Sequence, residues 1–216
     1  MLAAKFPKLV FAQTQSAPPH AVAYFADAFA DYPLTIWLLQ DEADKVRARF
    51  AMFEALLEAY EAQGATFVWV PSEGAVAIWL DFALSAPLPL RSRRDLRTCF
   101  LRRLAKQTVR RLVNLEVEAE KNCPLKEPHR SLLLVAVREQ DRCKGIGGEL
   151  VARLCKDATV PVLAETSDPK NFRFYMNLRF TAQNSYTIGN GSPQTWTFTR
   201  RSGRENSHGG CDAGAN

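Results

Sequence analysis

Residues 131–157 constrain the fold of this chain more than any other stretch. The stretch starts with six consecutive apolar residues, 132–137, and continues through a polar turn that contains three glycines. It ends in a segment whose apolar residues recur at Ile146, Leu150 and Leu154. The apolar run predicts a buried strand, and the four-residue spacing predicts a helix that follows it directly.

The turn between this strand and helix is suited to binding a diphosphate. Gly145, Gly147 and Gly148 let backbone amides approach a ligand closely, and the first-turn N–H groups of a helix have no intrahelical partner. A P-loop is excluded, because Lys144 precedes the glycines and no Ser or Thr follows them. A Rossmann turn would require a third glycine where Leu150 stands.

Arg142, Gly145 and Gly147 instead form an Arg-x-x-Gly-x-Gly pattern between the expected strand and helix. Glycine-rich turns of this kind also arise for packing reasons alone. Downstream, residues 161–180 read P-V-L-A-E-T-S-D-P-K-N-F-R-F-Y-M-N-L-R-F. With both segments the sequence resembles the GNAT superfamily of acyl-CoA N-acyltransferases, whose loop binds the pyrophosphate of coenzyme A. The second segment is similar to that family's next strand, its L-E-T-S-type turn and its N-x-x-F-Y-x-x-L-G-F helix.

The resemblance covers roughly residues 8–200, and its layout is most similar to puromycin N-acetyltransferase-like members. The segments that carry this layout are A-F-A-D-Y-P, K-E-P and E-T-S-D-P-K-N. It implies an α/β (α+β) GNAT fold, with a mixed, mostly antiparallel central sheet flanked by helices. Residues 1–200 would then form a single domain, and residues 201–216, which lack apolar content, are expected to be a disordered tail.

Hydrophobic periodicity and turn residues predict the other elements in the order that this fold requires. They are a strand at residues 8–14, a helix at residues 24–29 ending before Pro33, a helix at residues 42–62, two strands around residues 71–74 and a hairpin around residues 189–191. The apolar face of the second of these helices is expected to comprise Val46, Phe50, Phe53, Leu57 and Tyr60.

A basic helical insertion is expected at about residues 91–122. Its residues 91–111 hold nine Lys or Arg residues and one Asp, a charge of +8 in a chain whose total is +5. Its apolar face is expected to comprise Leu96, Phe100, Leu101, Leu104, Val109, Leu112 and Leu115. We favour a solvated face with the arginines extending into water. The alternatives are attraction of the 3'-phospho-ADP end of the coenzyme and an acidic partner such as nucleic acid, which no recognised nucleic-acid module supports.

Composition frames these expectations. A chain of 216 residues with 47% hydrophobic content is sufficient for one domain, and it contains no secretory signal pattern and no apolar run long enough to insert into a membrane. Its five cysteines form no C-x-x-C pair, which favours reduced thiols in the cytoplasm. Three histidines and these cysteines do not suggest a metal site. The oligomeric state cannot be derived from the sequence.

The function that the resemblance implies is acetyl transfer from acetyl-CoA to a primary amine, through direct attack in a ternary complex. A small-molecule amine is a better match than a protein lysine. The alternative is a catalytically degenerate module that binds coenzyme A for regulation or associates with nucleic acid. Cys143 and Arg179 stand where the family commonly has glycine, and at a positive φ each would be strained.

Acyl transfer from a thioester to an amine needs a base for the amine and an acid for the departing sulfur. Tyr175 matches the family's general acid, and it could otherwise be a packed aromatic. Glu165, at the end of a short apolar strand, is the expected base, because burial could raise its pKa toward neutrality. A capping or ion-paired Glu165 is nearly as plausible, and Glu127 and Asp81 are substitutes.

Eleven residues are expected to bind the coenzyme, the first three through their backbone: Val135, Ala136, Val137, Arg142, Cys143, Lys144, Gly145, Ile146, Gly147, Gly148 and Asn171. Asn171 could equally cap a helix or stabilise a turn. By resemblance, Phe29, Tyr32 and Trp37 belong to the region that shapes the acceptor site. The aromatic residues there could also belong to the ordinary core.

Overall fold

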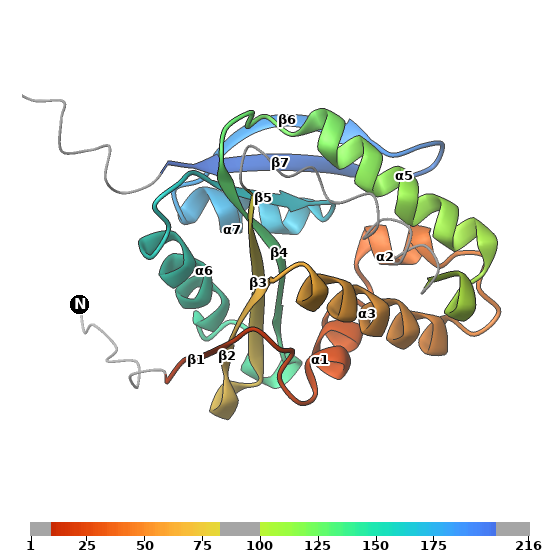
Figure 1. The fold of residues 1–216 in the computed structure, drawn as a ribbon, viewed down its shortest axis with the longest axis horizontal. Coiled ribbons are helices and arrows are strands. Elements are labelled where there is room, and N and C mark those ends of the chain that lie inside the picture. Colours follow the sequence, from red (N-terminus) through yellow and green to blue (C-terminus); the bar gives the residue numbers. More distant parts are fainter. Residues whose placement is uncertain (1–9, 83–99, 202–216) are drawn as a thin grey trace, which may run out of the picture.

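The computed structural model of the 216-residue chain describes residues 10–82 and 100–201 (Figure 1). The strands in these ranges are β1 (Ala12–Thr14), β2 (Thr66–Val70), β3 (Ala75–Phe82), β4 (His129–Val137), β5 (Val162–Thr166), β6 (Thr181–Thr187) and β7 (Gln194–Arg200). The α-helices are α1 (Ala21–Ala28), α2 (Pro33–Leu38), α3 (Lys45–Ala62), α5 (Lys106–Asn122), α6 (Ile146–Lys156) and α7 (Phe172–Asn177). Short 3₁₀ turns occur at Pro71–Glu73, Glu139–Asp141 and Pro169–Asn171.

The strands form one sheet in the order β1-β2-β3-β4-β5-β7-β6. The β4–β5 pair is parallel, and the other neighbouring pairs are antiparallel. This confirms the predicted mixed, mostly antiparallel sheet. It also confirms the hairpins expected around residues 71–74 and 189–191.

Helices cover both faces of the sheet (Figure 1). Successive side chains of β3 alternate between the two faces, as the period of a strand requires. Val76 and Ile78 pack with residues of α1, α3 and α5, whereas Ala77 and Trp79 pack with residues of α6 and α7. Residues 75–80 of β3 are therefore all buried, which explains their continuous apolar sequence.

The helix expected at residues 42–62 begins three residues later, because the side chain of Asp44 accepts the N–H of Arg47 at 3.0 Å and so caps α3. Its buried face includes Phe53 and Leu57, as expected, and is centred on Ala48, Met52 and Ala55. Val46 and Phe50, which we expected on that face, are 59% and 37% exposed. Each lies two residues from the centre of the face, which is about half a turn around the helix.

The basic insertion is only partly a continuous helix. Residues 100–103 are helical, the chain is extended at Ala105, and α5 then starts at Lys106. The carboxylate of Glu42 explains this break, since it accepts the Ala105 N–H at 2.8 Å and the Thr108 hydroxyl at 2.6 Å. A carboxylate at this place gives the start of α5 a hydrogen-bond acceptor and matches the positive end of the helix dipole. Residues 91–99 lie outside the described ranges.

Two features of the side chains in this insertion differ from our expectations. Leu101, expected on the apolar face, is 44% exposed. Arg103 pairs with Glu58 at 3.0 Å, and Arg111 pairs with Asp41 at 2.5 Å, so these arginines do not simply extend into water. Ion pairing to α3 and to the end of α2 therefore uses part of the local positive charge.

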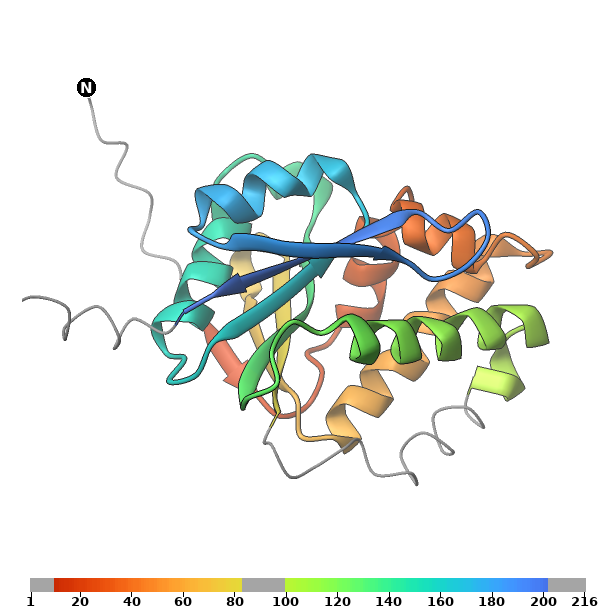
Figure 2. The same cartoon turned by 90° about the horizontal axis from the view of Figure 1, so that it is seen from above.

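α5 runs beside the β6–β7 hairpin at one end and approaches α2 at the other (Figure 2). Near the hairpin, Asn184 donates its side-chain N–H to the carbonyl of Asn122 at 2.9 Å. Near α2, the guanidinium of Arg111 lies 5.4 Å from the centre of the Trp37 ring. Within residues 10–82 and 100–201, no helix combines the length and apolar character needed to cross a membrane.

Both residues that replace an expected glycine have a positive φ, which is 62° at Cys143 and 62° at Arg179. Arg179 follows the end of α7, and its exposed side chain has no packing role to lose. We therefore expect Arg179→Gly to raise the free energy of unfolding by about 1 kcal/mol, because glycine adopts this conformation without strain.

Arg173 is the matched control for this prediction, because it is also an exposed arginine and lies within α7. Arg173→Gly should lower the free energy of unfolding by up to about 1 kcal/mol, since glycine in a helix interior is unfavourable. Urea denaturation of both variants measures the difference. Two shifts of the same sign would contradict the strain at Arg179.

Candidate functional site

A cavity of about 1040 Å³ runs between the two halves of the sheet. Its wall includes parts of α3, α5, β4, β5, α7 and the turn before α6. The sequence-predicted site residues that line it are Phe29, Tyr32, Val135, Val137, Arg142, Cys143, Gly145, Ile146, Gly147, Gly148, Glu165, Asn171 and Tyr175. The structure thus brings together residues that are up to 146 positions apart in the chain.

The cavity exists because β4 and β5 separate. Their parallel ladder ends at the pair Leu132–Ala164, although β4 continues to Val137. The β3–β4 register also shifts between Ile78 and Trp79, which marks a bulge that increases the local twist. Beyond Leu132, the described part of β5 therefore offers no strand partner to β4.

Backbone groups of β4 face this gap. Arg138 donates its N–H to the carbonyl of Gly74 at 3.0 Å. In an antiparallel pair, alternate residues direct their backbone groups to the same neighbouring strand, so the residue two positions before Arg138 also bonds to β3. Ala136 therefore faces β3, whereas the amides of Val135 and Val137 point away from β3 into the gap. We expected three residues to hold the coenzyme through their backbone. The amides of Val135 and Val137 face the gap, whereas Ala136 faces β3 and its side chain is buried in the core.

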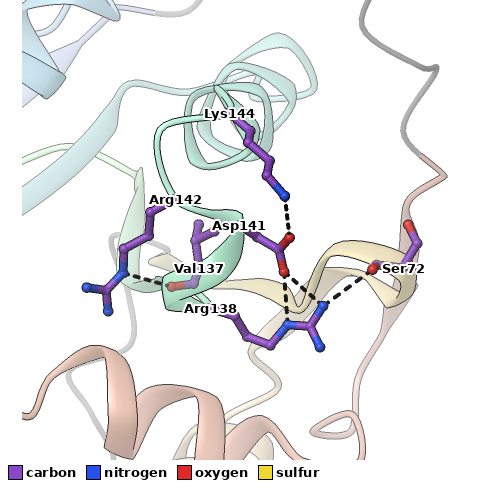
Figure 3. A network of polar contacts seen from close by, with 6 residues as sticks. All are labelled: Ser72, Val137, Arg138, Asp141, Arg142 and Lys144. Carbon is purple, nitrogen blue, oxygen red and sulfur yellow. Dashed lines mark hydrogen bonds and ion pairs between the residues drawn. The ribbon is translucent and has the colours of Figure 1, made fainter.

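The turn before α6 leads from β4 to the glycine-rich helix start. Gly145 precedes α6 with a φ of 79°, and the first-turn amides follow it. The Nε of Arg142 donates to the carbonyl of Val137 at 3.2 Å, which fixes this side chain at the edge of the cavity (Figure 3). The N-terminus of a helix, with its free amides and positive dipole end, is a suitable site for an anion.

Asp141 is the centre of an ion-pair network that holds this turn (Figure 3). One carboxylate oxygen accepts from Lys144 Nζ at 2.8 Å, and the other pairs with Arg138 Nη2 at 2.8 Å. The hydrogen bond from Lys144 lowers the pKa of Asp141, and Arg138 adds to this effect. Lys144, which we expected to bind the coenzyme, pairs with Asp141 and is not among the residues that line the cavity.

Gly147→Ala tests whether the start of α6 binds an anion. An added Cβ would lie 3.4 Å from Val137 Cγ2, an ordinary contact, and alanine favours helix, so stability should not fall. The methyl group would obstruct the approach of a ligand to the amides. We expect the affinity for coenzyme A to fall at least about tenfold, as the loss of one charge-assisted hydrogen bond predicts.

Gly189→Ala is the matched control, because Gly189 lies outside the cavity wall and no heavy atom lies within 4 Å of its added Cβ. Isothermal titration calorimetry with coenzyme A should give an unchanged affinity for this control. Equal affinities for the two variants would show that the amides at the start of α6 make no close contact with the ligand.

Tyr175 extends from α7 into the cavity wall. Its ring stacks on Phe198 at 5.1 Å and meets the edge of Phe180 at 5.5 Å, so its position is fixed by packing. Burial raises the pKa of Tyr175, and Tyr32 and Glu165 raise it further. The phenol therefore stays protonated at neutral pH, as a proton donor requires.

Glu165 lies on β5, and its side chain is largely removed from solvent. Burial raises the pKa of Glu165 to about 7, although a hydrogen bond from the hydroxyl of Tyr186 at 3.2 Å acts to lower it. A carboxylate with this pKa is suited to accept a proton near neutral pH. Of the two substitutes, Glu127 lines the cavity, whereas Asp81 pairs with Arg130 at 2.5 Å and does not.

The part of the cavity wall that α3 and β3 contribute is mainly apolar and aromatic. Phe29 and Tyr32 belong to the cavity wall, as we expected. Trp37 does not, because it is buried in α2 beneath the guanidinium of Arg111. It belongs to the core, which is the alternative that the sequence left open. Several other wall residues were not predicted as part of the site, namely Phe53, Leu56, Phe82, Phe100, Leu115, Cys123, His129, Thr166, Ser167 and Thr195.

Comparison with solved structures identifies the fold. One similar structure is arylalkylamine N-acetyltransferase 2 from Aedes aegypti, at a TM-score of 0.59 and 11% identity over 88% of this chain and 98% of that one. Another is a histone acetyltransferase-related protein from Corynebacterium glutamicum, at a TM-score of 0.58 and 17% identity over 88% of this chain and 96% of that one. A third is the polyamine N-acetyltransferase of Drosophila melanogaster, at a TM-score of 0.54 and 13% identity over 89% of this chain and 100% of that one. No family model matches the sequence. The chain therefore has the fold of the GNAT acetyltransferases.

Proposed function

We propose that this GNAT-fold chain is an N-acetyltransferase that moves the acetyl group of acetyl-CoA to a primary amine of a small molecule. The observation that carries the proposal is the single cavity described above. It joins a helix start suited to a diphosphate with a buried phenol and with a carboxylate whose pKa is about 7. Acyl transfer to an amine needs these three features together.

The residues of the chain fit acetyl-CoA along the length of the cavity. The amides at the start of α6, with Arg142, would hold the pyrophosphate, since they offer several donors close together. The amide of Val137 would bind the pantetheine part and the amide of Val135 would face the thioester, because β5 leaves both without a strand partner. When bound, the thioester supplies an activated acetyl group.

Three groups of the chain then act on the reacting atoms. Glu165, directly or through a water molecule, takes the proton that the ammonium group must lose to become a nucleophile. The amide of Val135 donates to the carbonyl oxygen as negative charge develops on it. Tyr175 gives a proton to the sulfur as the C–S bond breaks. The nitrogen gives up a second proton after its attack, which replaces the proton of Tyr175, while the first proton leaves Glu165 for the solvent.

The wall of the acceptor part favours an amine with an apolar or aromatic body. Phe29, Phe53, Phe82 and Phe100 contribute apolar surface there, and burial of such surface is the main source of affinity for a small ligand. Solved structures with this fold include arylalkylamine and polyamine N-acetyltransferases. The apolar wall, the arylalkylamine N-acetyltransferase structure and the puromycin N-acetyltransferase-like layout together support an aryl amine or an aminonucleoside over a protein lysine.

Release of free thiol from acetyl-CoA across a panel of amines tests the proposal. The panel should contain arylalkylamines, an aminonucleoside, agmatine, spermidine and a lysine-containing peptide. We expect the highest kcat/KM among the aromatic amines and little release with the peptide. If no amine released thiol while coenzyme A still protected the protein against thermal unfolding, the chain would be a coenzyme-binding module without turnover.

A further inference from the structure

Tyr186 on β6 holds the carboxylate of Glu165 from outside the cavity. The Oη of Tyr186 donates to the Oε1 of Glu165 at 3.2 Å. Glu165 lines the cavity, whereas Tyr186 is 8% exposed, packs in the core with residues of α1, α3 and α5, and is not part of the cavity wall. Tyr186 can therefore act on a ligand in the cavity only through Glu165.

The register of the sheet explains how β6 reaches a residue of β5. β7 lies between these two strands. Glu165 pairs with Thr197 of β7, and Tyr186 pairs with Thr195. The two threonines do not titrate, and they lie two positions apart, so all four side chains are on one face of the sheet. The phenol and the carboxylate meet across β7 on this face.

The hydrogen bond from Tyr186 leaves one oxygen of Glu165 for a ligand. Among residues 10–82 and 100–201, no other group forms a hydrogen bond with Glu165. The Oε1 is thus held by the phenol, and the Oε2 has no partner in these ranges. A buried carboxylate oxygen needs a partner, and the ammonium group of an acceptor can supply one from the cavity.

Titratable groups on the other elements packed against this pair do not replace Tyr186. They are Glu118 on α5, Cys123 after α5, Tyr175 on α7, and His129 and Arg130 on β4. The Sγ of Cys123 donates to the carbonyl of Leu125 at 3.3 Å, so the thiol proton is directed away from Glu165. Burial raises the pKa of Tyr186, and the charges of Glu165 and Glu118 raise it further, so the phenol stays a donor at neutral pH.

We propose that Tyr186 is a positioning residue for Glu165, which it holds by one oxygen so that the other oxygen takes the proton of the amine. This inference rests on the proposed acetyl transfer. An N–H bond of the ammonium group breaks and its proton joins the Oε2 of Glu165, while Tyr186 keeps its own proton. The hydrogen bond also favours the ionised carboxylate, because a charged acceptor bonds more strongly than a neutral one.

Carbon-13 NMR of protein labelled at the glutamate carboxyl carbons tests this inference without any ligand. The signal of Glu165 is the one that titrates near pH 7 and is missing from Glu165→Gln. Tyr186→Phe keeps the ring and removes the hydroxyl. It should raise the pKa of Glu165 by about one pH unit, as the loss of one charge-assisted hydrogen bond predicts. An unchanged pKa would overturn the inference.

The pH–rate profile is the second readout. In Tyr186→Phe the ascending limb of kcat/KM should move to higher pH by the same amount, and the plateau should fall about tenfold because the carboxylate is no longer held in one orientation. A limb that stayed in place would indicate a merely structural role. The NMR result does not depend on turnover, so an unshifted signal refutes the inference even if amines are acetylated. Absence of thiol release with every amine refutes the proposed function instead.

Thr197→Val is the matched control, because Thr197 is buried beside Glu165 in the sheet but donates to the carbonyl of Asn184 at 3.3 Å. Valine has nearly the same shape as threonine, so this variant also loses one buried hydroxyl from the β6–β7 hairpin. We expect lower stability, with the pKa of Glu165 and the ascending limb unchanged. Equal shifts in both variants would assign the effect to the hairpin as a whole and overturn the inference.

A second variant keeps the test decisive if Tyr186→Phe does not fold. Incorporation of 3-fluorotyrosine at position 186 retains the ring and the hydroxyl, and the fluorine makes the phenol more acidic and therefore a stronger donor. The pKa of Glu165 and the ascending limb should then move to lower pH, opposite to the effect of phenylalanine. No movement, or movement to higher pH, would contradict donation from Tyr186.

Discussion

Replacement of Tyr175 by Phe is expected to lower kcat for acetyl transfer by roughly 100-fold or more, the usual contribution of a positioned general acid. The variant keeps the aromatic ring, and hence the contacts with Phe198 and Phe180 that fix α7 against the sheet. Stability should therefore change little. The measurement is single-turnover acetyl transfer to the best amine of the panel, with the affinity for acetyl-CoA determined separately.

Two controls identify the cause of such a loss. Tyr24→Phe removes a hydroxyl outside the cavity wall and should keep full activity. An acyl donor with a more acidic leaving thiol should restore part of the rate of Tyr175→Phe, because that sulfur needs the proton less. A rate equal to that of the unmodified protein would reject Tyr175 as the acid.

Replacement of Glu165 by Gln is expected to lower kcat/KM by roughly 100-fold or more at pH 8, since a general base contributes rates of that order. The pKa of Glu165 is about 7, so in the unmodified protein activity should fall as the pH drops below 7 and the base becomes protonated. Glu165→Gln should lose this ascending limb of the pH–rate profile. A variant with the same limb would show that another group is the base.

The same substitution should raise stability at high pH. Burial moves the pKa of Glu165 from 4.5 to about 7, so the folded state favours the protonated acid, and ionisation destabilises it as the pH rises from about 4.5 to 7. Above pH 7 the cost is at most about 3 kcal/mol. Glu165→Gln avoids it, so its melting temperature relative to the unmodified protein should be higher at pH 8 than at pH 4.5. If Glu165→Gln lost activity but gained stability, Glu165 would be a residue that serves the reaction and not the stability of the fold.

Local sequence patterns were sufficient to predict most of the fold. The apolar run before the glycine-rich turn is β4, and the four-residue spacing after it is α6. The absence of glycine at positions 143 and 179 raised the question of a positive φ, and both residues have one. These features depend on neighbours within a few residues, which a sequence shows directly.

The acceptor part of the site could not be predicted to the same extent, because it depends on contacts between distant segments. Phe29, Tyr32 and Trp37 look alike in the sequence, but only the packing of α2 against Arg111 shows which of them is turned from the cavity. The break before α5 depends on Glu42, which lies 63 residues before Ala105. Neither contact has a local signal.

The properties of the titratable groups also arise from tertiary structure. Tyr186 contacts Glu165 across 21 residues, and the Tyr32 hydroxyl meets Thr166 across 134. A pattern search can nominate Glu165 or Tyr32, but it cannot show that one is a buried carboxylate with a pKa near 7 or that the other accepts the N–H of Ser167. Both features require the cavity to be formed.

Calorimetric titration of the purified chain with coenzyme A and with acetyl-CoA tests the central claim most directly. The account predicts saturable binding of one coenzyme per chain for both ligands, with a clear loss of affinity in Gly147→Ala. The absence of heat with either ligand, under conditions in which the chain is folded, would contradict it.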